Sequence, residues 1–140
     1  MKVLVVDDEV KNAELVAGEL RDAGFEAEFV NGGAAALRRL AAGRVDAVVT
    51  DLRMAPPDGM AVLAAVRERW PDTVVIVMTA YAALETARAA LKAGAWDYVE
   101  KEGDFAEVIA LALRSAGERA SLRHDVKQLS ATVESMRATE

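Results

Sequence analysis

Residues 45–51 read Val-Asp-Ala-Val-Val-Thr-Asp, and this stretch decides the fold. Four of its seven residues are valine or threonine and its apolar residues have no helical period, so it predicts a buried strand. A Pro-Pro-Asp-Gly turn signal follows at residues 56–59. The strand therefore places the carboxylate of Asp51 at its carboxyl end.

Two other strand-like runs also end in polar residues. Residues 2–6 are followed by Asp7 and Asp8, and residues 73–78 are followed by Thr79. Ligands of an open parallel sheet bind in the crevice at the carboxyl ends of its strands. These side chains are therefore expected to share one acidic pocket around Asp51.

Strands and helices alternate along the first hundred residues, as in βαβ units. Right-handed crossovers and short connections favour an α/β fold, a five-stranded parallel sheet with helices on both faces. The expected strands are residues 2–6, 25–30, 45–51, 74–78 and 95–100. The first helix opens at residues 7–9 and stops at Gly24, and further helices are expected at residues 34–42, 59–70 and 84–93.

Composition excludes several classes of protein. The 140 residues include no cysteine and one histidine, which excludes a disulfide framework and any thiolate or multi-histidine metal site. A net charge of −6 argues against direct contact with nucleic acid. No apolar run is long enough to span a membrane and no leader is evident, so a cytoplasmic protein is expected.

The last stretch predicts one long helix. It starts at a capping box formed by Asp104 and Glu107. Residues 1–116 are interpreted as the globular domain and residues 117–140 as a helical extension, a coiled-coil stalk that dimerises. A solvated tail is the alternative, because only about two and a half heptads are clean. The heptad positions are Leu122, Val126, Leu129, Val133 and Met136.

The residues at the sheet edge indicate phosphoryl chemistry. Asp7, Asp8 and Asp51 would repel one another without a cation, and Mg²⁺ is the usual partner of such a pocket. Thr79 and Lys101 add a hydroxyl and an ammonium for the oxygens of a phosphoryl group. Asp51 could be the nucleophile.

Each residue alone has a simpler explanation. Asp8 could cap the first helix, Thr79 could be an ordinary strand-end hydroxyl, and Lys101 could be solvated. His124 is expected on the surface of the stalk. The combination decides between the explanations, because the acids, the hydroxyl and the amine each follow a different parallel strand.

In order and placement these residues resemble the receiver domain of two-component response regulators. The resemblance covers residues 2–116 and implies a flavodoxin-like, doubly wound sheet with strand order 2-1-3-4-5. It implies that Asp51 accepts the phosphoryl group, that Thr79 hydrogen-bonds it and that Lys101 pairs with it. Tyr98 stands at the position of the switch aromatic, which turns inward on activation. The residues that carry the resemblance are Asp7-Asp8, Asp51, Thr79-Ala80 and Lys101.

The resemblance also implies a metal site. Mg²⁺ would be bound by Asp8, Asp51 and the backbone carbonyl of Arg53, with Asp7 assisting. Arg53 and Tyr81 flank the pocket and would tune water access and so the rate of dephosphorylation. Such a domain is not an enzyme: it accepts a phosphoryl group from a partner and loses it slowly.

Residues 51–54 and 85–98 are most similar to the NtrC-type subgroup, whose members activate sigma-54 polymerase. The implied partners are a sensor histidine kinase and a second copy of the chain. The copies would pair through the final helix, through the face formed by the fourth helix, fifth strand and final helix, or through both. AAA+ and DNA-binding domains would lie outside these 140 residues.

Two positions depart from the family pattern. Glu102 replaces the proline that usually follows the lysine, so a trans peptide, a re-aimed turn and a slightly misplaced Lys101 are expected. Ala55 replaces a second proline, and Pro56 is expected to keep Ala55 extended.

Two other functions remain open at this point. The chain could be a constitutive dimerisation module whose pocket binds Mg²⁺ without signalling. It could also be an aspartyl-phosphate hydrolase, but those enzymes typically have a second aspartate where Arg53 stands.

Overall fold

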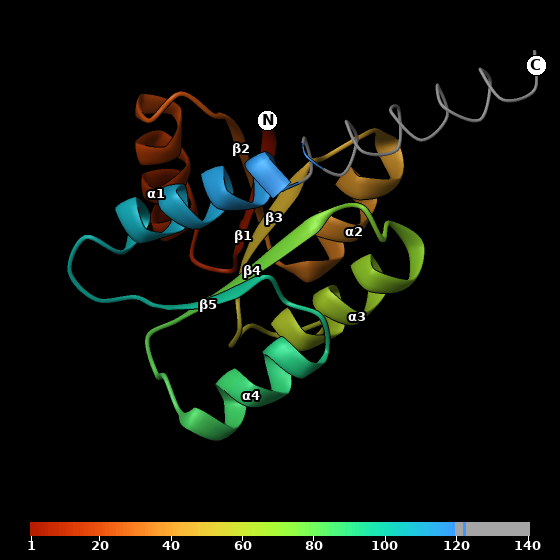
Figure 1. Ribbon diagram of the computed structural model, residues 1–140. Helices are drawn as coiled ribbons and strands as arrows, with labels where there is room; N and C mark the ends of the chain where they lie inside the picture. Colours follow the sequence, from red (N-terminus) through yellow and green to blue (C-terminus); the bar gives the residue numbers. More distant parts are fainter. Residues whose placement is uncertain (120–121, 123–140) are drawn as a thin grey trace, which may run out of the picture.

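The computed structural model describes residues 1–119 and residue 122. Five parallel strands form one sheet in the order β2-β1-β3-β4-β5 (Figure 1), as expected. In chain order the elements are β1 (Lys2–Asp7), α1 (Val10–Asp22), β2 (Glu26–Asn31), α2 (Gly33–Ala42), β3 (Ala47–Asp51), α3 (Gly59–Arg69), β4 (Val74–Thr79), α4 (Leu84–Lys92) and β5 (Asp97–Glu100), followed by a final helix over residues 105–119.

The central strands are apolar because helices cover both faces of the sheet. Every residue of β3 is buried, and so is every residue of β1 after Lys2. On one face α1 and the final helix pack over alternate residues of β1, β3 and β4. On the other face α2 and α3 cover the intervening residues, and Ala90 of α4 joins them. The sheet is thus the middle of three layers.

The final helix belongs to the core of the domain. Ile109 and Leu113 are fully buried against the sheet, while Val108 and Leu111 are exposed on the outer side. The expected packing of its first half is therefore confirmed. The capping box is not: the amide of Glu107 donates to the backbone carbonyl of Asp104 at 3.0 Å, not to its side chain.

The predicted stalk falls mostly outside the described residues. Leu122 is described and is exposed. Its four heptad partners and His124 lie outside, so the stalk stays a prediction. Within the described part of the chain, no helix is long and apolar enough to cross a membrane.

Strand limits differ slightly from expectation at the start of β3 and at the start of β5. β3 begins at Ala47, and the Asp46 side chain before it accepts a hydrogen bond from the Lys2 amide at 2.7 Å. β5 begins at Asp97. The Trp96 amide still donates to Val75 at 2.7 Å, so hydrogen bonding to β4 starts one residue before the strand.

Candidate functional site

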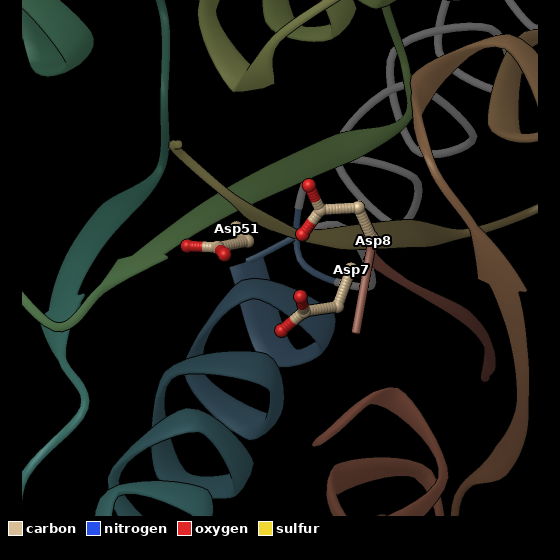
Figure 2. Close-up of side chains that lie close together, drawn as sticks. All are labelled: Asp7, Asp8 and Asp51. Carbon is tan, nitrogen blue, oxygen red and sulfur yellow. The ribbon is translucent and has the colours of Figure 1, made fainter. Parts of the chain in front are cut away.

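Three carboxylates meet at the carboxyl edge of the sheet. Asp7 ends β1, Asp8 follows it, and Asp51 ends the neighbouring strand β3. One oxygen from each carboxylate lies within 4.8 Å of the others. Their carboxyl groups gather in the same space (Figure 2). Parallel pairing of β1 and β3, with Val6 opposite Thr50, brings them together.

Lys101 reaches this acidic cluster from the end of β5. Its Nζ lies 2.8 Å from Oδ2 of Asp7 and 3.3 Å from Oδ2 of Asp51. Its backbone amide donates to the carbonyl of Thr79 at 2.7 Å, which anchors the strand end to β4. The Lys101 ammonium therefore reaches both Asp7 and Asp51 although Glu102 follows it.

The peptide between Lys101 and Glu102 is trans, as predicted. Among residues 1–119 the only cis peptide joins Pro56 to Pro57. The turn is closed locally, because the Glu102 amide donates to the carbonyl of Glu100 at 2.9 Å. Lys101 therefore keeps its reach without a proline after it.

Burial and neighbouring charges both shift the pKa values of Asp51 and Lys101. Burial raises the pKa of Asp51 above its ordinary value; Lys101 opposes that change and the charge of Asp7 adds to it. Burial alone would lower the pKa of Lys101, but its hydrogen bond to Asp7 and the charges of both aspartates outweigh burial and raise it. Lys101 thus stays protonated, while the Asp51 carboxylate is held in a site that disfavours its charge.

Asp8 is free to act as a ligand. The N-cap of α1 is Glu9, with no side-chain cap, so the capping explanation for Asp8 is wrong. It is Asp7 that serves the helix start, because its Oδ1 accepts from the Glu9 amide at 3.0 Å. The Asp8 carboxylate is exposed and accepts only a long hydrogen bond, 3.4 Å, from the Ala55 amide.

Thr79 lies at the end of β4, next to the strand that carries Asp51. Its residue is fully buried and its hydroxyl accepts from the Tyr81 amide at 3.2 Å. Within the described residues, the Thr79 hydroxyl makes no hydrogen bond to the three carboxylates. The fold thus brings Thr79 to the correct edge without joining it to the cluster.

Tyr98 packs against the core on the α2–α3 face of the sheet. Its hydroxyl is buried and has no hydrogen-bond partner within the described part of the chain. The Tyr98 ring was expected to turn inward on activation, but its hydroxyl is already buried in this structure.

Arg53 and Tyr81 form a stack beside the pocket. The guanidinium carbon of Arg53 lies 4.9 Å from the centre of the Tyr81 ring, within the range of a cation–π interaction. Both side chains are exposed. They join the loop after β3 to the loop after β4 at the solvent side of the site.

The donor set fits Mg²⁺. This cation prefers one or two carboxylates, takes further oxygen ligands and keeps several waters. The exposed Asp8 and the 9 % exposed Asp51 supply carboxylates with a route to solvent. Burial of the Asp51 charge beside Asp7 is a cost that a divalent cation would offset.

Sequence reasoning missed two features of this site. The first is the Ala55 amide, which reaches Asp8 because alanine, unlike proline, has an N–H. The second is the close contact of glycines with the loop after β3. The paired glycines at residues 32–33 mark a break between a strand and a helix, but they do not indicate which segment lies against them.

Comparisons with known proteins agree on one family. The profile of the response regulator receiver domain matches residues 3–113. The transcriptional regulatory protein ZraR of Escherichia coli is 40% identical over 103 residues, which cover 74% of this chain and 23% of ZraR. The regulatory protein AtoC of Escherichia coli is 37% identical over 126 residues, which cover 88% of this chain and 27% of AtoC. The chain therefore spans about a quarter of the length of these relatives.

Solved structures give the same result. NtrX from Brucella abortus matches 91% of the chain with a TM-score of 0.82 and 32% identity, and the match covers 29% of NtrX. A response regulator receiver domain protein from Clostridium thermocellum matches 86% of the chain with a TM-score of 0.80 and 29% identity, and the match covers 97% of it.

Proposed function

Because the chain belongs to the response regulator receiver domain family, and its relatives include regulators of the NtrC type, we propose that Asp51 accepts a phosphoryl group from a sensor histidine kinase. One observation carries this proposal. The Lys101 ammonium lies 3.3 Å from the Asp51 carboxylate, in a pocket that also contains Asp7 and Asp8. A nucleophile and its charge-compensating groups are therefore together at one strand edge.

The transfer needs little covalent chemistry from the protein. An oxygen of Asp51 forms a bond to phosphorus as the nitrogen–phosphorus bond of the phosphohistidine breaks, and the imidazole nitrogen keeps the electron pair and takes a proton. Positioning and charge compensation supply most of the catalysis in such reactions. Lys101 holds an ammonium where negative charge accumulates, and Asp7 orients that ammonium from 2.8 Å.

Asp8, Asp51 and the carbonyl of Arg53 would hold Mg²⁺, with Asp7 behind them. The bound cation would neutralise phosphoryl oxygens. Arg53 and Tyr81 would limit the access of water to the acyl phosphate through their stacked side chains, so self-dephosphorylation would be slow.

The proposed effect of phosphorylation is a change in pairing between copies of the chain. The new dianion would draw the Thr79 hydroxyl from the Tyr81 amide, and Tyr98 would adjust to the space that Thr79 leaves. This change in local charge would favour one of two conformations of the surface formed by α4, β5 and the final helix. Homodimerisation through that surface or the stalk would control domains that follow in the longer regulator.

The proposal is tested by intact mass after incubation with Mg²⁺ and acetyl phosphate. Wild-type protein is expected to gain one phosphoryl group, and Asp51→Asn is expected to gain none, because the amide is not a nucleophile for this transfer. A receiver domain of known activity, treated in parallel, serves as the positive control.

Two results would contradict the proposal. A phosphoryl group on Asp51→Asn would show that the acceptor is another residue. No phosphoryl group on either protein, with the positive control labelled, would favour the constitutive dimerisation module.

A further inference from the structure

Gly33, the first residue of α2, contacts the loop between β3 and α3. A Cβ built on Gly33 would overlap the carbonyl oxygen of Pro57 and would lie 2.8 Å from its Cγ. Real Cβ atoms essentially never approach other atoms this closely, so a side chain at Gly33 would force a displacement. Only glycine lets α2 and this loop lie as they do.

The far end of the same loop is held by a second glycine contact. A Cβ on Gly59 would overlap the carbonyl oxygen of Asp51 and would lie 2.7 Å from Cα of Leu52. The Gly59 amide donates to the carbonyl of Leu52 at 3.0 Å, and Asp58 caps α3. Because these contacts hold the α3 end of the loop, we expect a push on Pro57 to pass towards residues 53–55.

The loop would move before α2 does. Gly33 and Ala36 are buried, and α2 is fixed in the core by Ala36 and Leu40, which are 0% and 4% exposed. Arg53 and Ala55 of the loop are exposed, although Met54 between them packs against the core. Core side chains resist displacement more strongly than an exposed loop does.

Residues 53–55 include the residue of the loop that contacts the acidic cluster. The Ala55 amide donates to Oδ2 of Asp8 at 3.4 Å, so a shift of this segment removes a hydrogen bond from a proposed ligand. The Arg53 carbonyl, another proposed ligand, lies in the same segment. Groups that orient metal ligands typically change metal affinity by about 10-fold to 100-fold when they are lost.

We propose that Gly33 is a positioning residue for the divalent-cation site: the absence of a side chain there lets the β3–α3 loop close onto α2 and so aims the Arg53 carbonyl and the Ala55 amide at the cation and Asp8. The inference rests on the proposed function, because it takes Asp8, Asp51 and Arg53 as the ligands of Mg²⁺. The inference gives a role to Gly33 of α2, a residue that would not itself contact the cation.

The test is Mg²⁺ binding to Gly33→Ala, measured by calorimetry and by the NMR shift of the Ala55 amide. The Kd for Mg²⁺ is expected to rise by about 10-fold or more. Gly18→Ala is the matched control, because nothing lies within 4 Å of a Cβ at Gly18 and both substitutions raise helix propensity. Its Kd is expected to stay within about twofold of that of the wild type.

A second readout separates positioning from general damage. At saturating Mg²⁺ the rate of phosphorylation of Gly33→Ala is expected to return to that of the wild type, because the acceptor and Lys101 are intact. A rate that stays low at saturation, or an unchanged Kd, would overturn the inference. Absence of Mg²⁺ binding in the wild type would overturn the proposed metal site itself.

A second pair of variants covers the case in which Gly33→Ala does not fold. Pro57→Gly removes the ring but keeps the backbone carbonyl oxygen that a Cβ at Gly33 would overlap, so the push on the loop remains. Gly33→Ala combined with Pro57→Gly is then compared with Pro57→Gly alone. A rise in Kd of about 10-fold in the double variant supports the inference, and equal Kd values overturn it.

Discussion

The Asp51 side chain is subject to two opposing requirements. As the proposed nucleophile it must be ionised, yet burial raises its pKa and Asp7 repels its charge. Lys101 reduces the conflict without removing it, since its closest contact is with Asp7. Without a cation, an ionised Asp51 in this pocket would therefore lower the stability of the folded protein.

This conflict predicts the pH dependence of stability in EDTA. A carboxyl whose pKa is higher in the folded state binds its proton more readily there, so its contribution to stability is lost as pH rises through the folded pKa. Asp51→Asn has no such loss. The free energy of unfolding of Asp51→Asn, measured by urea denaturation, should exceed that of the wild type at neutral pH, and the difference should vanish below the ordinary aspartate pKa of about 3.9.

Added Mg²⁺ provides the control for this prediction. A ligand that binds only the folded state stabilises it by mass action, so millimolar Mg²⁺ should stabilise the wild type more than Asp51→Asn. A wild type that is more stable than Asp51→Asn at neutral pH in EDTA would contradict the interpretation.

The sequence was informative about individual residues wherever a functional group follows a strand. Asp7, Asp8, Asp51 and Lys101 were placed correctly, because parallel strands bring their carboxyl ends to one edge. The contacts of Gly33 were not predictable, because glycine has no side chain with which to indicate a partner. The distance between α2 and the loop is set by tertiary packing, which a local pattern does not encode.

Among the elements, the final helix was the hardest to place from the sequence. Its inner residues are as buried as those of the central strands, so the helix completes the layer that α1 begins. The sequence predicted that residues up to 116 belong to the globular domain, but it did not predict which side of this helix faces the sheet. The predicted capping box was wrong. The Glu107 amide donates to the backbone carbonyl of Asp104, and not to the Asp104 side chain, which was expected to accept that hydrogen bond.

Two leucines of this helix test its role. Leu113 is fully buried and Leu111 is 58% exposed, two residues away. Leu113→Ala should lower the free energy of unfolding by about 2–5 kcal/mol, as for other buried leucines. Leu111→Ala should change it by less than about 0.5 kcal/mol. Equal effects in urea denaturation would show that the helix does not pack as described.

At the scale of the whole molecule, strand order followed from the family resemblance and was confirmed. Alternation of strands and helices alone indicates a parallel sheet but does not give the order of its strands. Pairing between copies of the chain could not be predicted in the same way as strand order, because it depends on exposed surfaces and not on the packing of a single copy. Val108 and Leu111 of the final helix are exposed on the proposed surface, and so are Leu84 and Leu91 of α4.

Phosphorylation is predicted to change the oligomeric state. With Mg²⁺ and beryllofluoride, a phosphoryl mimic, the wild type is expected to sediment with a mass approaching twice its 15.0 kDa, and without them as a lighter species. Asp51→Asn should show no change. The same mass for the wild type under both conditions would favour a constitutive module.

The buried hydroxyl of Tyr98 has a consequence for the balance between conformations. A buried polar group without a partner costs about 1–3 kcal/mol, and this cost belongs to the arrangement described here. Any arrangement that offers the hydroxyl water or an acceptor gains that amount, and about 1.4 kcal/mol is tenfold in a population ratio. One unsatisfied oxygen would therefore lower, by that amount, the free-energy difference between this arrangement and one in which the hydroxyl is hydrogen-bonded.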